Sequence, residues 1–539
     1  MPSTTSIFIV GGGLNGLSTA LLLAKRKVAC TVVERHPTTS IQYKFRGISP
    51  RSMEIYRSAG IDEEIRAHRT GDQKSGALAR VKNLADHNVT WMDQPWAETS
   101  DISPVSAETC DQDVLEPILR RHAERLGADI RFNTELIEVE QNEDAIVAYI
   151  RDRGTGREDV VYASYLVVAD GANGNIRPKL GIERHGPGPL QHWINVIFDT
   201  DLSPELQGRR ITSVFVQDIN GTLVPREGSS RWSMAVQYVP EQGEKVEDFT
   251  PERCAQLVRK GAGRTDTKVE IMDIRPWEMA AYLADRYSTG RAYLVGDTAH
   301  VIPPTGGFGG NTGIHDAHNL AWKLDAVVRG VAGPALLGTY ELERRPVAER
   351  TLAQALARLQ AWFKDPGKKL PSPEKIIDDH WVIFGHLYKG GVLIAERSSN
   401  MEEPFENPQK PSGRPGSRAP HVFLDRAGRR ISTLDLFDGQ WVLLTGAEGS
   451  AWISAANKIP AAAEFSLICH RIGPEGDLQD SSRQWNAVYG VNEGGAVLVR
   501  PDGFIAWRKR EGVGKPQEAL REVLHRLSFK DATPASLVA

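Results

Sequence analysis

The sequence predicts an α/β protein in which a mostly parallel sheet carries an inserted antiparallel sheet domain and a third, smaller α/β domain follows. Three observations predict this class. Apolar runs alternate with helical patterns near the N-terminus. Residues 186–275 change to alternating polar and apolar segments separated by turns, and a stretch rich in Pro, Gly and charge at 400–418 precedes a last block of strands and a closing helix. With 539 residues, the chain is long enough for about three domains.

The first elements form a βαβ unit. Residues 6–10 (SIFIV) are a strand, GGGLNG follows, LSTALLLAKRKV has helical spacing, and CTVVERH is a second strand that ends in an acid. Gly11, Gly13 and Gly16 satisfy GxGxxG, which lets the backbone approach a pyrophosphate at a helix N-terminus. Glu34 can accept hydrogen bonds from ribose hydroxyls and would repel a 2'-phosphate. The unit therefore predicts the adenosine of FAD or NAD, and an ordinary tight turn is the alternative.

A second glycine cluster lies almost 300 residues farther on. Residues 291–297 (RAYLVGD) predict a buried strand that ends in Asp297, at the sheet edge where α/β proteins bind ligands. The loop PTGGFGGNTG follows and leads into a helix. Asp297 can accept from a ribityl hydroxyl, the helix N-terminus can stabilise negative charge on reduced flavin, and Pro303 and Pro304 would hold the loop against the ring. A glycine-rich structural turn is the alternative.

Together with YLVVADGANGNIRPKLGI, which contains Asp170 and Gly171, these two motifs occur in a fixed order. On these motifs the chain resembles the class A flavoprotein monooxygenases of the para-hydroxybenzoate hydroxylase type, and within them the aromatic polyketide hydroxylases of antibiotic biosynthesis. LLGTYELERRPVAE and RGISPRSMEIYRSAGI extend the resemblance, which covers residues 5–355. It implies a Rossmann-like FAD-binding domain with an inserted antiparallel β-sheet substrate domain.

The resemblance implies noncovalent FAD, NADPH or NADH as reductant, and O2. The residues expected at the FAD site are Gly11, Gly13, Leu14, Asn15, Gly16, Glu34, Arg35, Arg46, Gln112, Asp170, Gly171, Asp297, Pro304, Gly307, Gly309, Gly310, Asn311 and Thr312. The side chain of Gln112 could instead cap a helix. Three local departures from the family pattern are Leu14-Asn15 after the second fingerprint glycine, Gly47 after Arg46, and Thr298 in place of the usual Ala. Gly47 would leave more room beside the flavin for a bulky substrate.

The reaction implied by the resemblance is oxygen insertion into a polycyclic aromatic polyketide. NAD(P)H reduces the flavin, O2 adds at C4a, and the hydroperoxide transfers its distal oxygen to an electron-rich ring. Oxidative ring cleavage, Baeyer-Villiger insertion and a spiroketal-forming rearrangement would use the same chemistry and stay open. A flavin halogenase is disfavoured because its Trp-x-Trp-x-Ile motif does not occur. A flavin-binding protein without catalysis is the alternative from another class.

Aromatic side chains of the antiparallel segments suit a flat polycyclic ligand, although about half of any strand's side chains face away from a given surface. We therefore expect about two or three of the candidate strand residues to contact substrate. The candidates are Trp193, Phe198, Phe215, Trp232, Met234 and Tyr238 on strands, with Pro303 and Gly306 from the loop. No catalytic residue can be chosen, since His192, Tyr238 and His300 are all conceivable bases. Glu343, Arg344 and Arg345 are expected to form an ion network on a helix surface.

The last part of the chain resembles the thioredoxin-like C-terminal domain of the phenol hydroxylase and polyketide hydroxylase branch. PGSRAPH, LDLFDGQWVLLTG and VLVRPDGFIAWR carry this likeness. WVLLTGAEGSAW has no CxxC pair, so we expect a packing or dimer-supporting element and either a monomer or a homodimer. The predicted boundaries are 1–72, 106–185 and 276–399 for the FAD-binding domain, 73–105 and 186–275 for the substrate domain, 400–418 for a linker and 419–539 for the thioredoxin-like domain.

Composition excludes several classes. The net charge is −4, the pI is near 6.4, and basic residues form no long run, so nucleic acid is a poor candidate partner. Cys30, Cys110, Cys254 and Cys469 lie too far apart for a metal cluster or a CxxC pair. No apolar stretch reaches the roughly 18 residues of a membrane span, and the N-terminus lacks a basic region before its apolar run. We expect a soluble, cytoplasmic protein without a metal site.

Overall fold

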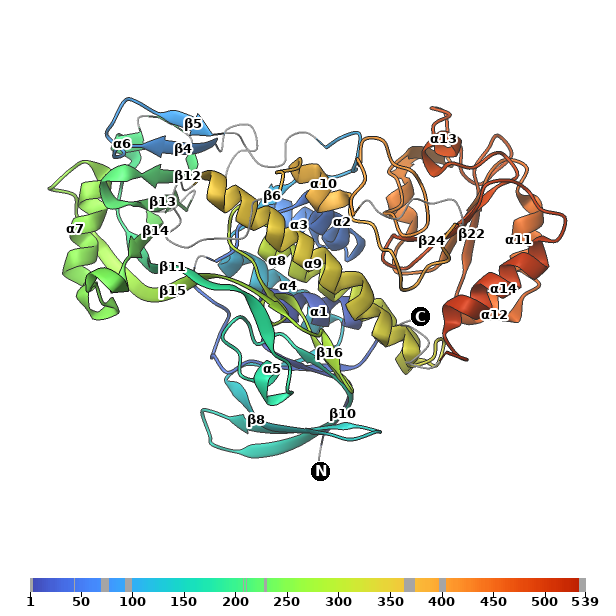
Figure 1. Cartoon of the computed structure of the whole chain (residues 1–539), viewed down its shortest axis with the longest axis horizontal. Coiled ribbons are helices and arrows are strands. Elements are labelled where there is room, and N and C mark those ends of the chain that lie inside the picture. The colour runs from blue at the N-terminus through green and yellow to red at the C-terminus, as the bar shows by residue number, and fades with distance from the viewer. Residues whose placement is uncertain are drawn as a thin grey trace.

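The computed structural model of the chain places two sheet-containing parts on either side of a central α/β core (Figure 1). It describes residues 3–42, 44–68, 77–92, 99–206, 208–209, 211–226, 230–362, 374–396 and 404–532. The predicted fold class is confirmed, since the core sheet is mainly parallel, the second sheet is mainly antiparallel, and the C-terminal part is a small α/β unit.

The core sheet has the strand order β16-β17-β10-β1-β2-β7, and β1 pairs in parallel with both β2 and β10. An antiparallel extension, β8 and β9, is hydrogen-bonded to the early part of β10. The strands are β1 (Ser3–Val10), β2 (Cys30–Val33), β7 (Asp129–Arg131), β8 (Thr134–Gln141), β9 (Ile146–Asp152), β10 (Glu158–Val168), β16 (Ser288–Thr289) and β17 (Ala292–Leu294).

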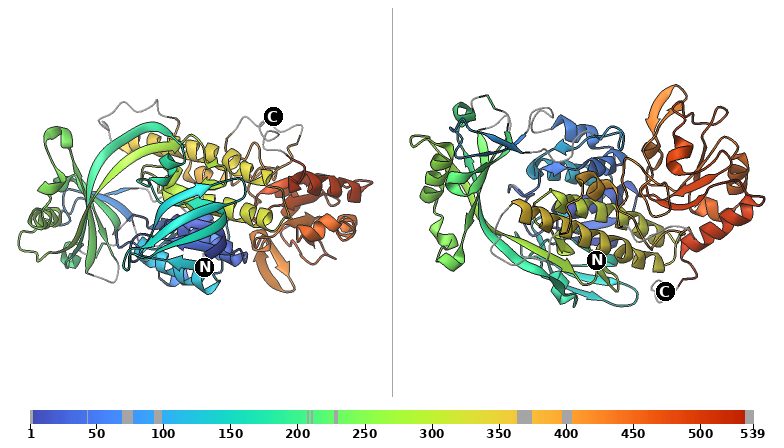
Figure 2. Two further views of the ribbon diagram at one scale, coloured as in Figure 1. Left: turned by 90° about the horizontal axis from the view of Figure 1, so that it is seen from below. Right: turned by 45° about the horizontal axis from the view of Figure 1, so that its top comes forward.

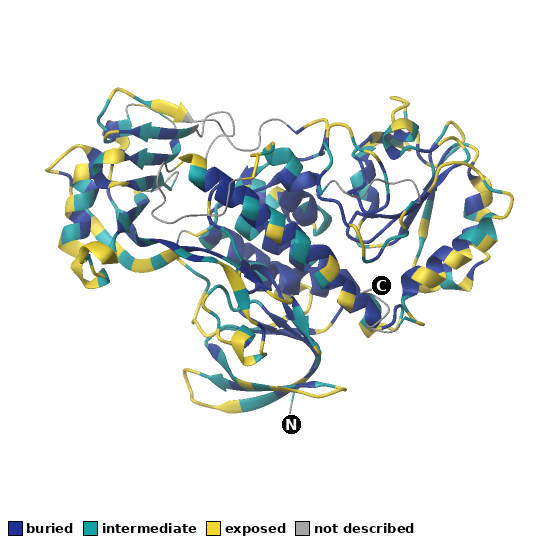
Figure 3. Cartoon of the chain, in the orientation of Figure 1, coloured by how far each residue is buried: buried dark blue, intermediate teal, exposed yellow. Residues whose placement is uncertain are grey.

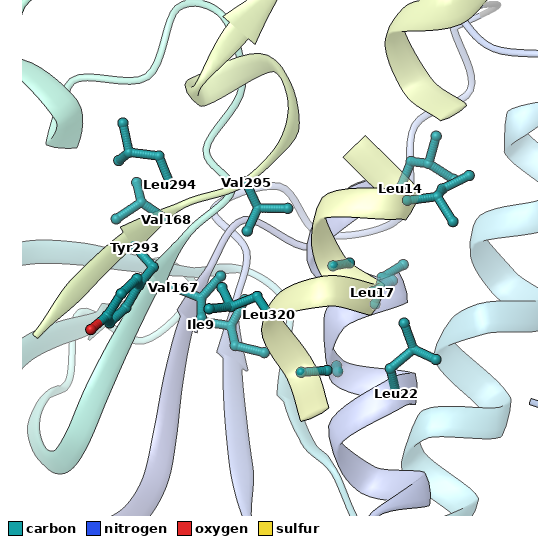
Figure 4. Packing of buried hydrophobic residues seen from close by; sticks show 14 of the residues in the cluster. Ile9, Leu14, Leu17, Leu22, Val167, Val168, Tyr293, Leu294, Val295 and Leu320 are labelled. Carbon is teal, nitrogen blue, oxygen red and sulfur yellow. The ribbon is translucent and has the colours of Figure 1, made fainter. Parts of the chain in front are cut away.

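Helices pack on the core sheet and bury almost all of its apolar side chains. α1 (Leu14–Lys25) lies against α4 (Gln112–Arg125) and α8 (Phe308–Val328), and α9 (Ala335–Trp362) covers α8. Because α1 has neighbours on several sides, its sequence is apolar nearly all round, and Leu17 is fully buried. Figure 4 shows Leu320 of α8 beside Ile9 of β1 and Val167 of β10. Each such side chain contributes about 1.5–3 kcal/mol of burial.

The second sheet has the order β18-β15-β11-β14-β13-β12-β4-β5, and α7 (Pro251–Ala262) covers one of its faces. The long strands β11 and β15 run from this sheet back to the core, so they join the two layers (Figure 2). The strands are β4 (Ala77–Val81), β5 (Thr90–Met92), β11 (Arg184–Asp199), β12 (Ile211–Val216), β13 (Gly221–Pro225), β14 (Arg231–Tyr238), β15 (Glu270–Ala284) and β18 (His300–Val301).

The C-terminal part has the thioredoxin-like order β22-β21-β23-β24, with the first two strands parallel and the rest antiparallel. Helices separate the strands in the sequence βαβαββα. Its elements are β21 (Val442–Thr445), α11 (Ser450–Ala456), α12 (Pro460–Glu464), β22 (Ile468–Arg471), α13 (Trp485–Tyr489), β23 (Ala496–Val499), β24 (Ile505–Lys509) and α14 (Pro516–Ser528). Residues 404–418 pack against neighbouring segments, where Tyr388 N–H donates to the Gly416 carbonyl.

Short elements complete the fold. They are β3 (Gly47–Ile48), α2 (Pro50–Ser58), α3 (Asp62–Ala67), β6 (Glu108–Thr109), α5 (Ile176–Lys179), α6 (Ser203–Leu206), α10 (Asp379–Phe384), β19 (Phe423–Arg426), β20 (Arg429–Ser432) and the 3-10 turns η1 (Gln217–Ile219), η2 (Pro240–Gln242), η3 (Val246–Asp248), η4 (Gly296–Thr298) and η5 (Thr433–Leu436). Within the described ranges, no helix is both long enough and apolar enough to cross a membrane.

The expectation that Glu343 and Arg344 lie on a helix surface is wrong. Both are buried, because α8 and the C-terminal part cover this face of α9 (Figure 3). Glu343 accepts from Lys323 Nζ at 2.8 Å and from both terminal nitrogens of Arg500 at 2.7 and 2.8 Å. Arg500 Nε also donates to Asp502 at 2.9 Å. This buried ion cluster joins α8 and α9 to the turn between β23 and β24.

Candidate functional site

The register of the core sheet brings the predicted motifs to one edge. Val10 of β1 is paired with Val33 of β2 and with Val168 of β10, and Val168 is paired with Leu294 of β17. The chain leaves each of these strands directly into a motif. GGGLNG therefore lies between Glu34 on one side and the Asp170 and Asp297 motifs on the other, at the carboxyl edge where such sheets bind ligands.

Two glycines of the first motif, Gly11 and Gly16, occupy positions that leave no room for a side chain. Gly11 has a φ of +106°, and a Cβ there would lie 2.2 Å from the Ala169 carbonyl oxygen. A Cβ on Gly16 would lie 1.8 Å from the Gly11 oxygen. Gly13 is different, because a Cβ would meet only Glu116 Oε1, at 3.6 Å. Gly11 and Gly16 thus allow the tight turn and the helix-strand contact, whereas Gly13 faces open space at the N-terminus of α1.

Glu34 lies where the motif predicts an acid, and its carboxylate is anchored by nearby donors. It accepts from the Gly12 N–H at 2.8 Å, from the His36 N–H at 2.9 Å, and is 2.6 Å from His36 Nδ1. The neighbouring Arg35 is exposed. The bonds to Gly12 and His36 fix the carboxylate beside the glycine turn, and Oε2, which accepts from Gly12, retains capacity to accept a further hydrogen bond.

Two side chains that depart from the family pattern connect the motifs. The Thr298 hydroxyl accepts from the Gly171 N–H at 3.0 Å and donates to Asp170 Oδ1 at 3.2 Å. The amide of Asn15 fills the space above two glycines, since a Cβ on Gly296 or Gly313 would come within 1.9 or 2.5 Å of it. Burial raises the pKa of Asp170, with the hydrogen bonds from Ile176 and Thr298 acting against this shift. The departures therefore support the motif geometry.

Asp297 and the second glycine loop form the other half of the site. The Asp297 side chain is open to solvent, yet protein atoms surround it closely enough for desolvation to raise its pKa. Gly306 and Gly307 have φ values of +89° and +69°, and Gly307 is the N-cap of α8 without a side-chain cap. Pro304 and Gly307 are exposed, whereas Pro303 is buried. This loop therefore presents backbone and a helix N-terminus to the same side as Asp297.

Asn311 holds the glycine loop in place through its side chain. Its Oδ1 accepts from the Ser49 N–H at 2.9 Å and the Ser52 hydroxyl at 2.7 Å, and its Nδ2 donates to the carbonyls of Gly47 and Gly307 at 3.0 and 2.9 Å. The Thr312 hydroxyl donates to the Phe308 carbonyl at 2.9 Å. A cofactor contact from either residue would therefore come from its backbone. Gly309 and Gly310 stay half-buried on the first turn of α8.

Arg46 and Gln112 lie between the core and the second sheet. Arg46 Nη1 donates to the Thr212 carbonyl at 2.9 Å, and its Nε is 3.3 Å from Asp111 Oδ1. Gln112 begins α4 and donates from its amide to Glu116 Oε1 at 2.6 Å. The Gln112 N–H donates to the Phe45 carbonyl at 3.0 Å, so the backbone N–H and the side-chain amide of this residue both have partners within the protein. Gln112 also borders a recess with Trp232 and Ser233 of β14.

The aromatic candidates divide between the two faces of the second sheet. Phe198, Met234 and Tyr238 pack in the hydrophobic core beneath α7, on the opposite face of the sheet from Trp193. Trp232 belongs to the same core but also borders the recess beside Gln112. Trp193 faces the other way and stacks on Trp277 with ring centroids 5.8 Å apart. Phe215 lies 5.3 Å from the Arg80 guanidinium. Trp193 is thus the strand aromatic that faces the core layer.

The conceivable bases have structural partners. His300 is buried, and its Nε2 is 2.6 Å from Asp316, which also accepts from Arg344 Nε at 2.7 Å. His192 Nδ1 is 3.8 Å from Glu278 and its ring packs against Tyr238. These contacts give no reason to choose either histidine as a base. Groups of three or more His, Cys, Asp or Glu side chains suited to a metal ion do not occur among the described residues.

Glu116 is a site residue that the sequence interpretation missed. It is fully buried on α4, one helical turn after Gln112, and its carboxylate faces Gly13. Desolvation raises its pKa to about 7, partly opposed by hydrogen bonds from Gln112 and Ser40. The i,i+4 spacing from Gln112 is the signal that could have indicated it.

The donor set fits an extended dinucleotide such as FAD. Gly13 leaves room at the N-terminus of α1, Glu34 lies at one end of the edge, and Asp297 and the uncapped α8 lie at the other. Glu34 suits an adenosine ribose, the α1 N-terminus a pyrophosphate, Asp297 a ribityl hydroxyl, and α8 the negative charge of a reduced ring. The GGGLNG motif and the Asp297 loop thus lie at the same edge of the core sheet, where each would bind one half of the dinucleotide.

Comparisons with known proteins point to the same cofactor. The chain matches the FAD binding domain family over residues 4–355 and the aromatic-ring hydroxylase C-terminal family over residues 412–528. A putative polyketide hydroxylase of Streptomyces halstedii is 39% identical over 542 residues, covering 96% of both chains. Aklavinone 12-hydroxylase RdmE of Streptomyces purpurascens is 38% identical, covering 97% of this chain and 98% of its own length.

Solved structures show the same architecture. A ternary complex of aklavinone-11 hydroxylase with FAD and aklavinone has a TM-score of 0.91 at 36% identity, covering 97% of this chain and 99% of the other. The flavin-dependent monooxygenase PieE, in complex with FAD and substrate, has a TM-score of 0.87 at 28% identity, covering 98% and 99%. On the family matches and the full-length relatives, the chain belongs to the FAD-dependent aromatic-ring hydroxylases, in the polyketide hydroxylase branch.

Proposed function

We propose that the protein inserts one atom of O2 into an electron-rich ring of a polycyclic aromatic polyketide at the expense of NADPH or NADH. The balance is ring-H + O2 + NAD(P)H + H⁺ → ring-OH + H2O + NAD(P)⁺. FAD would supply the redox chemistry when bound, as the acceptor of the hydride and as the group that reacts with O2. The observation that supports this most strongly is the meeting of Glu34, the α1 N-terminus, Asp170 and Asp297 at one sheet edge.

The chain's own residues would bind the cofactor, hold charge and exclude water. Backbone N–H groups at the start of α8 would stabilise negative charge on the ring, because a helix N-terminus carries about half a positive charge. Arg46, which donates to Thr212 of the second sheet, would keep that sheet over the core. Closing the two layers around the reacting atoms keeps water from the reactive form of the cofactor.

The substrate would lie between the core layer and the second sheet. Trp193 and Trp277 form a flat apolar surface on the face that is turned away from α7, and Asn195 accepts from Trp277 Nε1 at 2.9 Å. Pro303 and Gly306 bound the same space from the glycine loop in this proposal. A planar polycyclic ligand fits stacked indoles, and the similar aklavinone-11 hydroxylase was solved in complex with FAD and aklavinone.

A second outcome of the same chemistry is supported by one relative. Tetracenomycin A2 monooxygenase-dioxygenase of Streptomyces glaucescens is 37% identical and covers 97% of both chains. Its name describes more than a single oxygen insertion. The product would distinguish ring cleavage, Baeyer-Villiger insertion or rearrangement from hydroxylation. In these cases the product would gain more than one oxygen atom or would have an altered carbon skeleton.

The rate at which NADPH or NADH is oxidised tests the proposal. Purified holoprotein is mixed with NADPH or NADH, with and without aklavinone as a polycyclic phenolic probe, and absorbance at the nicotinamide band is followed. We expect aklavinone or a related polycyclic phenol to accelerate the oxidation of either NADPH or NADH. A slow rate that no polycyclic phenol changes would favour a flavin-binding protein without this activity.

Asp297→Ala should weaken FAD retention by about tenfold to a hundredfold. The variant loses a charge-assisted hydrogen bond worth about 1.5–3 kcal/mol. Flavin fluorescence after serial dilution of the holoprotein measures the dissociation constant. Asp266→Ala is the control, since Asp266 is an exposed carboxylate that pairs with Arg264 in another part of the molecule. Equal retention by both variants would refute the proposed role of Asp297.

A further inference from the structure

Glu116 connects three segments at the pyrophosphate end of the proposed site. Its Oε1 accepts from Gln112 Nε2 at 2.6 Å, and its Oε2 accepts from the Ser40 N–H at 3.1 Å. The Leu14 backbone, at the start of α1, also acts on the carboxylate and lowers its pKa. A Cβ on Gly13 would lie 3.6 Å from Oε1. The carboxylate therefore lies against the turn that approaches a bound pyrophosphate.

The charge environment of Glu116 is unusual for a buried carboxylate. None of the ion pairs among the described residues includes it, and Lys44, a cation that lowers its pKa, is exposed. Its partners are neutral donors, and burial raises its pKa to about 7. A pyrophosphate brings two negative charges to the same turn, which disfavours an ionised neighbour. Binding of the dinucleotide and ionisation of Glu116 thus oppose each other.

We propose that Glu116 is a positioning residue that takes up one proton when FAD binds and orders Gln112, Ser40 and the α1 turn in both protonation states. This inference rests on the proposed FAD site. The Gln112 amide can rotate, so that it donates to a carboxylate and accepts from a carboxylic acid. The hydrogen bond between the two side chains is then kept, while the charge beside the pyrophosphate is removed.

Other groups around Glu116 do not supply this proton near neutral pH. Tyr56 of α2 and Cys110 before α4 face the same region, and burial raises the pKa of both, that of Cys110 to about 12. They stay neutral in this range. Lys44 is an exposed cation of the loop after β2. Glu34 and His36 form a pair on the other side of the glycine turn, and the variants below separate their contribution.

The direction of the effect follows from linkage. If Glu116 titrates near 7 without FAD and at a higher pH with it, binding takes up a proton between these two values. Affinity is then highest below the lower value and falls as pH rises, by at most about tenfold per pH unit for one proton. We expect the dissociation constant of FAD to rise by about tenfold or more between pH 6.5 and 9.

The test uses full-length holoprotein diluted at a series of pH values between 6 and 9, with released FAD measured by its fluorescence. In Glu116→Gln, the affinity should change little across this range and should match or exceed the wild-type value at pH 9. Glu116→Ala should lose affinity at every pH, because Gln112 and Ser40 lose their partner. Glu124→Gln, on the exposed face of the same helix where Glu124 pairs with Arg120, should keep the wild-type profile.

Each result decides the inference. A wild-type dissociation constant that does not change with pH would overturn it without any variant. The same pH dependence in wild type and Glu116→Gln would assign the proton to another group and also overturn it. A flat profile in Glu116→Gln with retained FAD would support it. Absence of FAD binding by wild type at every pH would instead refute the proposed function on which the inference rests.

Discussion

Arg500→Met should lower the free energy of unfolding by about 3–5 kcal/mol, the range for breaking a buried ion pair by removing one partner. Arg500 is fully buried and donates to both oxygens of Glu343 and to Asp502. The variant leaves two buried carboxylates with only Lys323 as a close cation for Glu343. Urea denaturation of the holoprotein, followed by tryptophan fluorescence, measures the change.

The control for this prediction is Arg510→Met in the same part of the chain. Arg510 is exposed and pairs with Glu396 at 3.0 Å, so its loss should cost less than about 1 kcal/mol. If the free energy of unfolding fell by similar amounts in the two variants, the buried ion cluster would not be what stabilises the contact of the C-terminal part with α8 and α9. Large destabilisation by Arg500→Met alone would show that this contact, and not the loss of a charge in general, carries the stability.

Gly11→Ala should abolish FAD retention and destabilise the core sheet. The added Cβ would lie 2.2 Å from the Ala169 carbonyl oxygen, in backbone with a φ of +106°. Either the glycine turn or the end of β10 must move, and both support the proposed pyrophosphate site. Absorbance of bound flavin after gel filtration measures retention, and thermal unfolding measures stability.

Gly127→Ala is the control for Gly11→Ala, because it shares the positive φ but not the steric clash of the added Cβ. Gly127 has a φ of +102°, but a Cβ there would meet nothing within 4 Å. We expect a loss of about 1–2 kcal/mol from the unfavourable φ and full retention of FAD. If both variants kept FAD equally, the close approach between the first motif and β10 would not be needed for the site.

The local sequence was sufficient to predict the structure of a motif whose residues all lie close together in the chain. The order strand, GGGLNG, helix predicts the βαβ unit because the glycines, the helix start and Glu34 all lie within about 30 residues. The same holds for the strand that ends before Asp297. The edge that joins them could be predicted because parallel strands place their carboxyl ends together.

The local sequence did not predict which side chains are buried where the residues that cover them lie far away in the chain. Glu343 and Arg344 follow the pattern of an exposed helix face, and only the packing of residues such as Arg500 shows that this face is covered. The aromatic strand residues failed for a related reason. Alternation along β11 separates Trp193 from Phe198, but the sequence does not show which face α7 covers. Glu116 was missed because its neighbours come from three segments.

The most direct test of the central claim is the fate of O2. Holoprotein is supplied with NAD(P)H, ¹⁸O2 and a polycyclic phenol that accelerates nicotinamide oxidation, and the product is analysed by mass spectrometry. The proposed function predicts one ¹⁸O atom per product molecule, an intact carbon skeleton and one NAD(P)H consumed per oxygen inserted. A product without label, or nicotinamide oxidation that yields only hydrogen peroxide with every accelerating phenol, would contradict it.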